Sequence, residues 1–97
     1  MPAYVLARID VHDPEAFTRE YLPAGSPTVE QYGGRYLAAG APEVLEGDVP
    51  PGQVALLEFE SAEQAQRWWN SSAYRAAVPL RQRSATSSWE LLEGVVP

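Results

Sequence analysis

Three segments of this sequence are predicted as strands that carry large apolar side chains on both faces. Alternate residues of a strand point to opposite faces of a sheet, so a strand with one solvent-exposed face normally alternates between apolar and polar residues. That alternation fails here, because Leu57 and Phe59 point to one face while Val54 and Leu56 point to the other. The three segments are Ala3–Ile9, Gln53–Phe59 and Ser88–Val95. Both faces of the sheet therefore require a cover.

A helix is predicted after the first of these strands. Asp13 suits the N-cap position and Pro14 the first helical position, and apolar residues recur at helical spacing as far as Tyr32. Two prolines inside this stretch lack the backbone donor that a helix needs, so a break is expected over residues 23–27. The pair Gly33-Gly34 then ends the helix.

The second half of the chain carries similar signals. Ser61 with Gln64 three residues later forms a capping box, which predicts the start of a second helix. Ser72 is predicted to cap a short helical segment that reaches Val78, and Pro79 interrupts it. Of the remaining segments, Arg35–Ala39 is predicted as a strand and Glu43–Glu46 as a short strand or extension. A turn-rich loop is predicted at Gly47–Gly52 and a short helical piece at Leu80–Arg83.

The main elements follow one another in the order β-α-β-β-α-β. This is the order of the ferredoxin-like α+β fold, an antiparallel sheet with its helices on one face. A chain of 97 residues is enough for one domain, which here spans residues 1–97. A second copy on the uncovered face would bury about 800 Å² per partner. We therefore expect a homodimer, and the alternative is a monomer with a few exposed leucines.

The composition excludes several kinds of partner and site. The chain has 13 acidic and 7 basic residues, all of the latter arginines, and its net charge of −6 makes nucleic acids and anionic membranes poor partners. Without cysteine it has no disulfide, thiolate nucleophile or cysteine metal site, and its single histidine, His12, cannot form a pair. No apolar run approaches the ~20 residues of a membrane span. We expect a cytoplasmic protein without a cofactor or metal.

A set of short motifs along the whole chain resembles one known family. The motifs are Tyr32-Gly33-Gly34-Arg35-Tyr36-Leu37, Val44-Leu45-Glu46-Gly47-Asp48 with Pro50-Pro51, Leu57-Glu58-Phe59, Ser61, Ser72-Ala73-Tyr74, Leu80-Arg81 and Glu93-Gly94-Val95. The chain resembles the small bacterial family catalogued as domain of unknown function thirteen-thirty, in the dimeric α+β barrel superfamily. This resemblance implies a ferredoxin-like protomer and a homodimer, and it implies no activity. Relatives in the superfamily include cofactor-independent monooxygenases and isomerases.

Glu58 is the first candidate for chemistry. It lies in the most apolar predicted strand, where burial would raise the pKa of its carboxyl group unless an arginine compensates it. Arg8, Arg35 and Arg81 are the candidate partners. Glu58 is interpreted either as a general base or substrate-carboxylate site, or as half of a structural ion pair.

Other candidates are aromatic and basic residues that could line a pocket. Tyr74 and Arg81 lie seven residues apart, two turns of a helix, and a phenol with a guanidinium suits an anionic or enolic ligand. Tyr32 and Arg35 flank the glycine turn, and Trp68 is a further candidate for ligand contact. For each of them the structural alternative is a salt bridge, a turn or core packing.

Three hypotheses about function follow. The first is an uncharacterised homodimer that binds a small organic acid or aromatic ligand between sheet and helices. Its pocket would be lined by some of Tyr4, Tyr32, Trp68, Trp69, Tyr74 and Trp89. The second is a cofactor-independent monooxygenase or isomerase acting on an enol or phenol, with Glu58 as base and Arg81 or Arg35 stabilising the anion. The third is a structural or regulatory dimer without a ligand.

Overall fold

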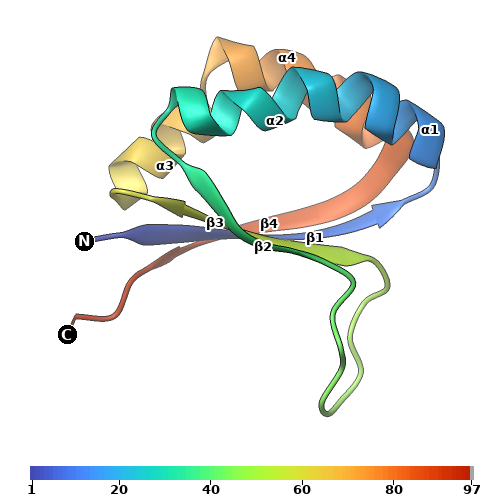
Figure 1. Cartoon of the computed structure of the whole chain (residues 1–97), viewed down its shortest axis with the longest axis horizontal. Helices are drawn as coiled ribbons and strands as arrows, with labels where there is room; N and C mark the ends of the chain where they lie inside the picture. The colour runs from blue at the N-terminus through green and yellow to red at the C-terminus, as the bar shows by residue number, and fades with distance from the viewer. Residues whose placement is uncertain (97) are drawn as a thin grey trace.

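The strands form one four-stranded antiparallel sheet, and the first strand of the chain lies in its interior. The computed structural model describes residues 1–96 (Figure 1). The strands are β1 (Ala3–Val11), β2 (Arg35–Gly40), β3 (Gln53–Phe59) and β4 (Ala85–Glu93). This order, β2-β3-β1-β4, together with the element sequence along the chain, confirms the predicted ferredoxin-like α+β fold.

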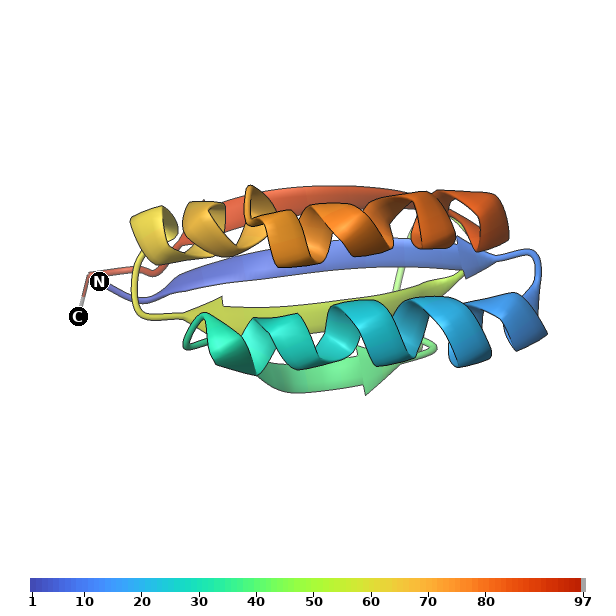
Figure 2. The same ribbon diagram turned by 90° about the horizontal axis from the view of Figure 1, so that it is seen from above.

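All helices cover the same face of the sheet. They are α1 (Pro14–Ala16), the π-helical turn η1 (Phe17–Tyr21), α2 (Leu22–Gln31), α3 (Ala62–Trp69) and α4 (Ser72–Ser84). Seen from above, α1 and α2 run along the side of β2 and β3, and α3 and α4 along the side of β1 and β4 (Figure 2). The opposite face carries no helix (Figure 1). Among residues 1–96, no helix is both long and apolar enough to cross a membrane.

The first helical stretch starts where predicted but does not break over residues 23–27. Asp13 accepts a hydrogen bond from the backbone N–H of Ala16, so the predicted N-cap is confirmed. The irregularity lies earlier, in η1, where the N–H of Leu22 donates to the carbonyl of Phe17, five residues back. Pro23 then falls in the first turn of α2, where the missing donor is tolerated. The helix therefore continues to Gln31.

The glycine turn after α2 is confirmed, and its two glycines have different roles. Gly33 has a φ of +79°, a left-handed conformation that glycine adopts at little steric cost. Gly34 is needed for space, because a Cβ atom there would lie 2.5 Å from the ring of Phe59. The turn thus brings α2 and β3 into close contact.

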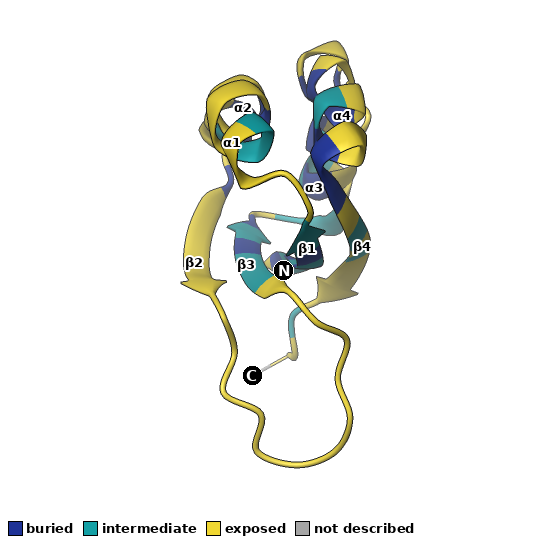
Figure 3. Cartoon of the chain, turned by 90° about the vertical axis from the view of Figure 1, so that its right-hand side faces the viewer, coloured by how far each residue is buried: buried dark blue, intermediate teal, exposed yellow. Residues whose placement is uncertain are grey.

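Four further predictions required correction. Ser71, not Ser72, caps α4, because its hydroxyl accepts from the N–H of Tyr74, and α4 runs through Pro79 without interruption to Ser84. Strand β4 begins at Ala85 rather than Ser88. The segment 43–46 is no strand but part of an exposed loop that projects beyond the uncovered face of the sheet (Figure 3). No strand of the sheet pairs with this segment, so its backbone N–H and C=O groups have no sheet partner.

The apolar residues on the two faces of the strands lie in two different environments. On the helix-covered face, Val5, Leu57 and Phe59 are buried in the main core. On the other face, Leu6 lies directly opposite Leu56 in the register of β1 and β3, and both remain partly exposed. Leu92 of β4, 56% exposed, extends the same apolar surface. We call the surface formed by Tyr4, Leu6, Val54, Leu56 and Leu92 the outer face.

Candidate functional site

The space between sheet and helices is dominated by aromatic rings. Trp68 and Trp69 are neighbours on α3, Tyr74 lies in the first turn of α4, and Trp89 lies on β4. Trp68 packs 4.4 Å from Tyr74, and Trp69 packs 5.5 Å from Trp89, measured between ring centroids. Neighbouring residues of a helix point about 100° apart, so Trp68 is fully buried while Trp69 is only half-buried.

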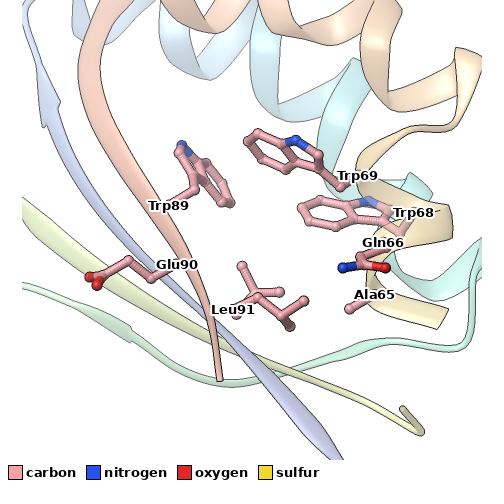
Figure 4. A pocket seen from close by; sticks show the side chains of 8 residues that line it. Ala65, Gln66, Trp68, Trp69, Trp89, Glu90 and Leu91 are labelled. Atoms are coloured by element: carbon pink, nitrogen blue, oxygen red, sulfur yellow. The ribbon is translucent and has the colours of Figure 1, made fainter. Parts of the chain in front are cut away.

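A cavity of about 260 Å³ opens beside these rings (Figure 4). Its wall is mainly apolar and includes three indoles, and it is lined by Val5, Ala65, Gln66, Trp68, Trp69, Trp89, Glu90 and Leu91. The carboxylate of Glu90 points away from the indole rings in Figure 4. We call this space the tryptophan cavity. Flat apolar walls of this kind suit a flat apolar ligand.

A second cavity of about 220 Å³ lies on the other side of Trp89. Trp89 stands opposite Ala7 in the sheet register, between Val5, which lines the tryptophan cavity, and Ile9, which lines the second. Tyr21, Tyr36 and Trp89 provide the aromatic part of the second cavity's wall. The indole of Trp89 therefore separates two spaces within one layer.

Arg81 is buried in the same layer. It is only 5% exposed, and its Nη1 donates to the hydroxyl of Ser87 over 2.6 Å. Its guanidinium carbon lies 4.9 Å from the centre of the Trp89 ring and 5.8 Å from that of Trp69, which places the cation against two aromatic faces. Ser87 also accepts a hydrogen bond from Trp89 Nε1 over 2.9 Å.

Two buried phenols complete the polar part of the layer. The hydroxyl oxygens of Tyr21 and Tyr74 are 2.8 Å apart and share a hydrogen bond. Burial raises the pKa of both phenols above the usual value, and the charge of Arg81 opposes the rise in each case. For Tyr21, the neighbouring Tyr74 raises the pKa further. Both phenols are therefore neutral hydrogen-bonding groups at physiological pH.

The structure brings together three of the predicted site residues, Trp68, Tyr74 and Arg81, and places the other three elsewhere. Glu58 lies on the opposite side of the sheet, where its Oε1 accepts from Nε and Nη2 of Arg35 at 2.8 and 2.7 Å. Arg35 is directly opposite Glu58 in the register of β2 and β3, which selects it over the other candidate partners. Tyr32 caps the end of α2, and its carbonyl accepts from Gln64 over 2.7 Å.

Tyr21 and Ser87 were not identified from the sequence as site residues. Tyr21 belonged to the apolar stripe of the first helix, and no local signal distinguished it from a core residue. Ser87 was missed because the predicted strand began at Ser88; with the observed start at Ala85, residues 87, 89 and 91 share the helix-covered face. Among residues 1–96, no three His, Asp or Glu side chains lie close enough together to hold a metal ion.

Comparisons with known proteins extend these observations. The profile of a family described as a domain of unknown function (DUF1330) matches residues 2–95. No curated protein matches the sequence. A solved protein of unknown function from Rhodopseudomonas palustris is similar at 23% identity and a TM-score of 0.77, covering 99% of this chain and 84% of that one.

Two further solved structures share the fold at lower identity. SnoaB, a cofactor-independent oxygenase from Streptomyces nogalater, is 13% identical with a TM-score of 0.70, over 99% of this chain and 95% of SnoaB. A dimeric ferredoxin-like protein of unknown function from Thermobifida fusca is 15% identical with a TM-score of 0.65, over 95% of this chain and 90% of that protein. At these identities the similarity shows the fold alone.

Proposed function

The chain belongs to the DUF1330 family, whose function is unknown, and from that premise we propose that it is a homodimer that binds a small aromatic molecule between its sheet and its helices. The observation that carries this proposal is the tryptophan cavity. Ligand pockets are typically apolar and concave, with volumes of about 300–1,000 Å³ for drug-sized ligands. A cavity of about 260 Å³ suits a ligand of one or two rings.

The outer face supports the homodimer. Leu6 and Leu56 meet at its centre, and Tyr4 and Leu92 extend it across the sheet. Apolar surface of this extent on a sheet is stabilised by a second sheet packed against it. The solved Thermobifida fusca protein with this fold is dimeric. A cytoplasmic location, and the exclusion of nucleic acid and membrane as partners, remain predictions from composition.

Calorimetric titration with indole and 2-naphthol tests the ligand proposal. Both probes are neutral at pH 7, so they report the aromatic cavity without a contribution from charge. Replacing Trp69 with leucine removes one wall of the cavity, and we expect it to weaken binding at least about tenfold. Tyr32→Leu is the matched control, because Tyr32 is a half-buried aromatic residue outside the cavity.

Two results would contradict the proposal. If neither indole nor 2-naphthol binds, the tryptophan cavity is left without a ligand, which favours the structural or regulatory dimer. Equal losses in Trp69→Leu and Tyr32→Leu would place the binding elsewhere. Sedimentation at micromolar concentration tests the assembly, and a species of 10.6 kDa would overturn the homodimer.

The enzymatic alternative, a cofactor-independent monooxygenase or isomerase, stays a prediction. The sequence assigns Glu58 as its base. Glu58 is bound to Arg35 and lies across the sheet from the tryptophan cavity. Consumption of oxygen, or isomerisation of an enolisable aromatic probe, by the purified protein would favour this alternative over simple binding.

A further inference from the structure

Arg81 is the one buried arginine in the described part of the chain, and it has no acidic partner there. The four ion pairs among residues 1–96 involve other arginines. A cation removed from water is destabilising unless its charge and its donors are compensated. Here the compensation consists of the faces of Trp69 and Trp89, the hydroxyl of Ser87 and the nearby phenol of Tyr74, but no carboxylate. An unneutralised positive charge is thus held inside a chain of net charge −6.

One side of the Arg81 guanidinium is free to bind an acceptor. Nη1 donates to Ser87, whereas the buried Nε–H finds no acceptor in residues 1–96. Buried donors without an acceptor are uncommon in folded proteins. The group that best fits adjacent N–H donors of a guanidinium is a carboxylate, whose two oxygens have a matching spacing.

The Arg81 guanidinium contacts two aromatic rings that also form part of the wall of the ligand space. Trp69 and Trp89, which lie against the guanidinium, both line the tryptophan cavity. Trp89 also lines the second cavity. A rotation of the Trp89 side chain would join the two spaces and leave Arg81 at their junction.

We propose that the ligand is an aromatic carboxylate, whose ring occupies the tryptophan cavity and whose carboxylate binds Arg81 when the indole of Trp89 turns aside. This inference rests on the proposed function and adds the charge of the ligand and the residue that recognises it. Tyr74, whose ring packs against both Trp68 and Trp69 and whose hydroxyl is hydrogen-bonded to that of Tyr21, holds this part of the layer in place.

The test compares 2-naphthoate with 2-naphthamide, a neutral molecule of nearly the same shape, by calorimetric titration of the full chain at pH 7. A charge-assisted hydrogen bond is stronger than a neutral one, so we expect the carboxylate to bind at least about tenfold more tightly. Arg81→Gln is expected to remove this preference. Arg83→Gln, an exposed arginine two residues further along α4, is the matched control and is expected to keep it.

The wild-type ratio of the two affinities needs no variant and keeps the test valid if Arg81→Gln fails to fold. Arg81→Lys, which keeps the charge and loses the planar pair of donors, is expected to reduce the preference without abolishing it. Equal affinities for naphthoate and naphthamide would overturn the inference and leave the proposed function standing. Failure of all aromatic probes, including indole and 2-naphthol, would overturn both.

The displacement of Trp89 has its own readout. Its indole N–H donates to Ser87 in the free protein. We expect 2-naphthoate to shift the NMR signal of this N–H further than 2-naphthamide does, because the ring of either probe lies against Trp89 but only the carboxylate turns the indole aside. An unchanged signal in the naphthoate complex would overturn the proposed movement.

Discussion

Both faces of the sheet are apolar, but their apolar residues have different roles. The helix-covered face holds closely packed rings together with buried polar groups, among them Arg81 and the pair Tyr21–Tyr74. The outer face carries aliphatic side chains around Leu6 and Leu56, with the ion pair Arg35–Glu58 on the same side of the sheet. The covered face therefore stabilises the protomer and provides the candidate site, whereas the outer face is suited to association.

The comparison also distinguishes Arg35 and Arg81, the two arginines that were predicted as site residues. The side chain of Arg35 is 70% exposed and that of Glu58 is 23% exposed, so solvent still screens the pair, which contributes about 1 kcal/mol at most to stability. Arg81 is buried without a carboxylate, a position that a protein seldom leaves uncompensated. Arg35 and Arg81 are the same type of residue, but their exposure differs. Arg35 is therefore structural, and Arg81 is a candidate for ligand recognition.

The largest effect is expected from Trp68→Ala on the covered face. Trp68 is 1% exposed, and its indole N–H donates to Thr28 over 2.9 Å. Removal of so large a buried ring typically lowers the free energy of unfolding by about 3–5 kcal/mol. Urea unfolding at fixed protein concentration measures this loss. A loss below about 1 kcal/mol would mean that the covered face is not the main source of protomer stability.

A smaller effect, of a different kind, is expected from Leu56→Glu on the outer face. A carboxylate placed beside Leu6 in the centre of an apolar interface must lose its water when the two outer faces meet, and we expect the dimer to dissociate about a hundredfold more readily, or ~3 kcal/mol. Circular dichroism should show a folded chain, and sedimentation a protomer. Leu45→Glu is the control, because Leu45 is 90% exposed in the loop after β2. Identical sedimentation of the two variants would remove the distinction between the faces.

The smallest effect concerns the buried phenols. Burial raises the pKa of Tyr21 and of Tyr74 in the folded protein, so above pH ~10 the unfolded chain releases protons that the folded chain keeps. The contribution of the two phenols to stability is therefore constant below that pH and falls above it. Urea unfolding between about pH 9 and pH 11 measures the slope. If the double variant Tyr21→Phe/Tyr74→Phe kept the same slope, other groups would be responsible.

Elements with local signals were predicted well from the sequence. Asp13 at the N-cap, Ser61 with its hydroxyl on the N–H of Gln64, and the left-handed Gly33 depend on neighbours within a few residues. The prolines were less informative. Pro27 and Pro79 lie inside helices that continue past them, because packing against the sheet stabilises the helix by more than one lost hydrogen bond destabilises it.

The site was predicted only in part. Trp68, Tyr74 and Arg81 were identified as candidates, but the sequence left Arg8, Arg35 and Arg81 all open as partners of Glu58. The register of β2 and β3 decided between them, since it places Arg35 opposite Glu58 and on the face away from Arg81. Strand pairing depends on residues far apart in the chain, and no local pattern encodes it.

By itself, the sequence determined that the strands are apolar on both faces, where the helices begin, and that the charge is negative with arginine as its only cation. These properties follow from periodicity and composition, which act along the chain. Only the tertiary structure decided which face the helices cover, that Trp89 divides the space beneath them, and that Arg81 lies there without a carboxylate. Burial and pairing arise when distant segments pack together, and their free energies depend on that arrangement rather than on sequence neighbours.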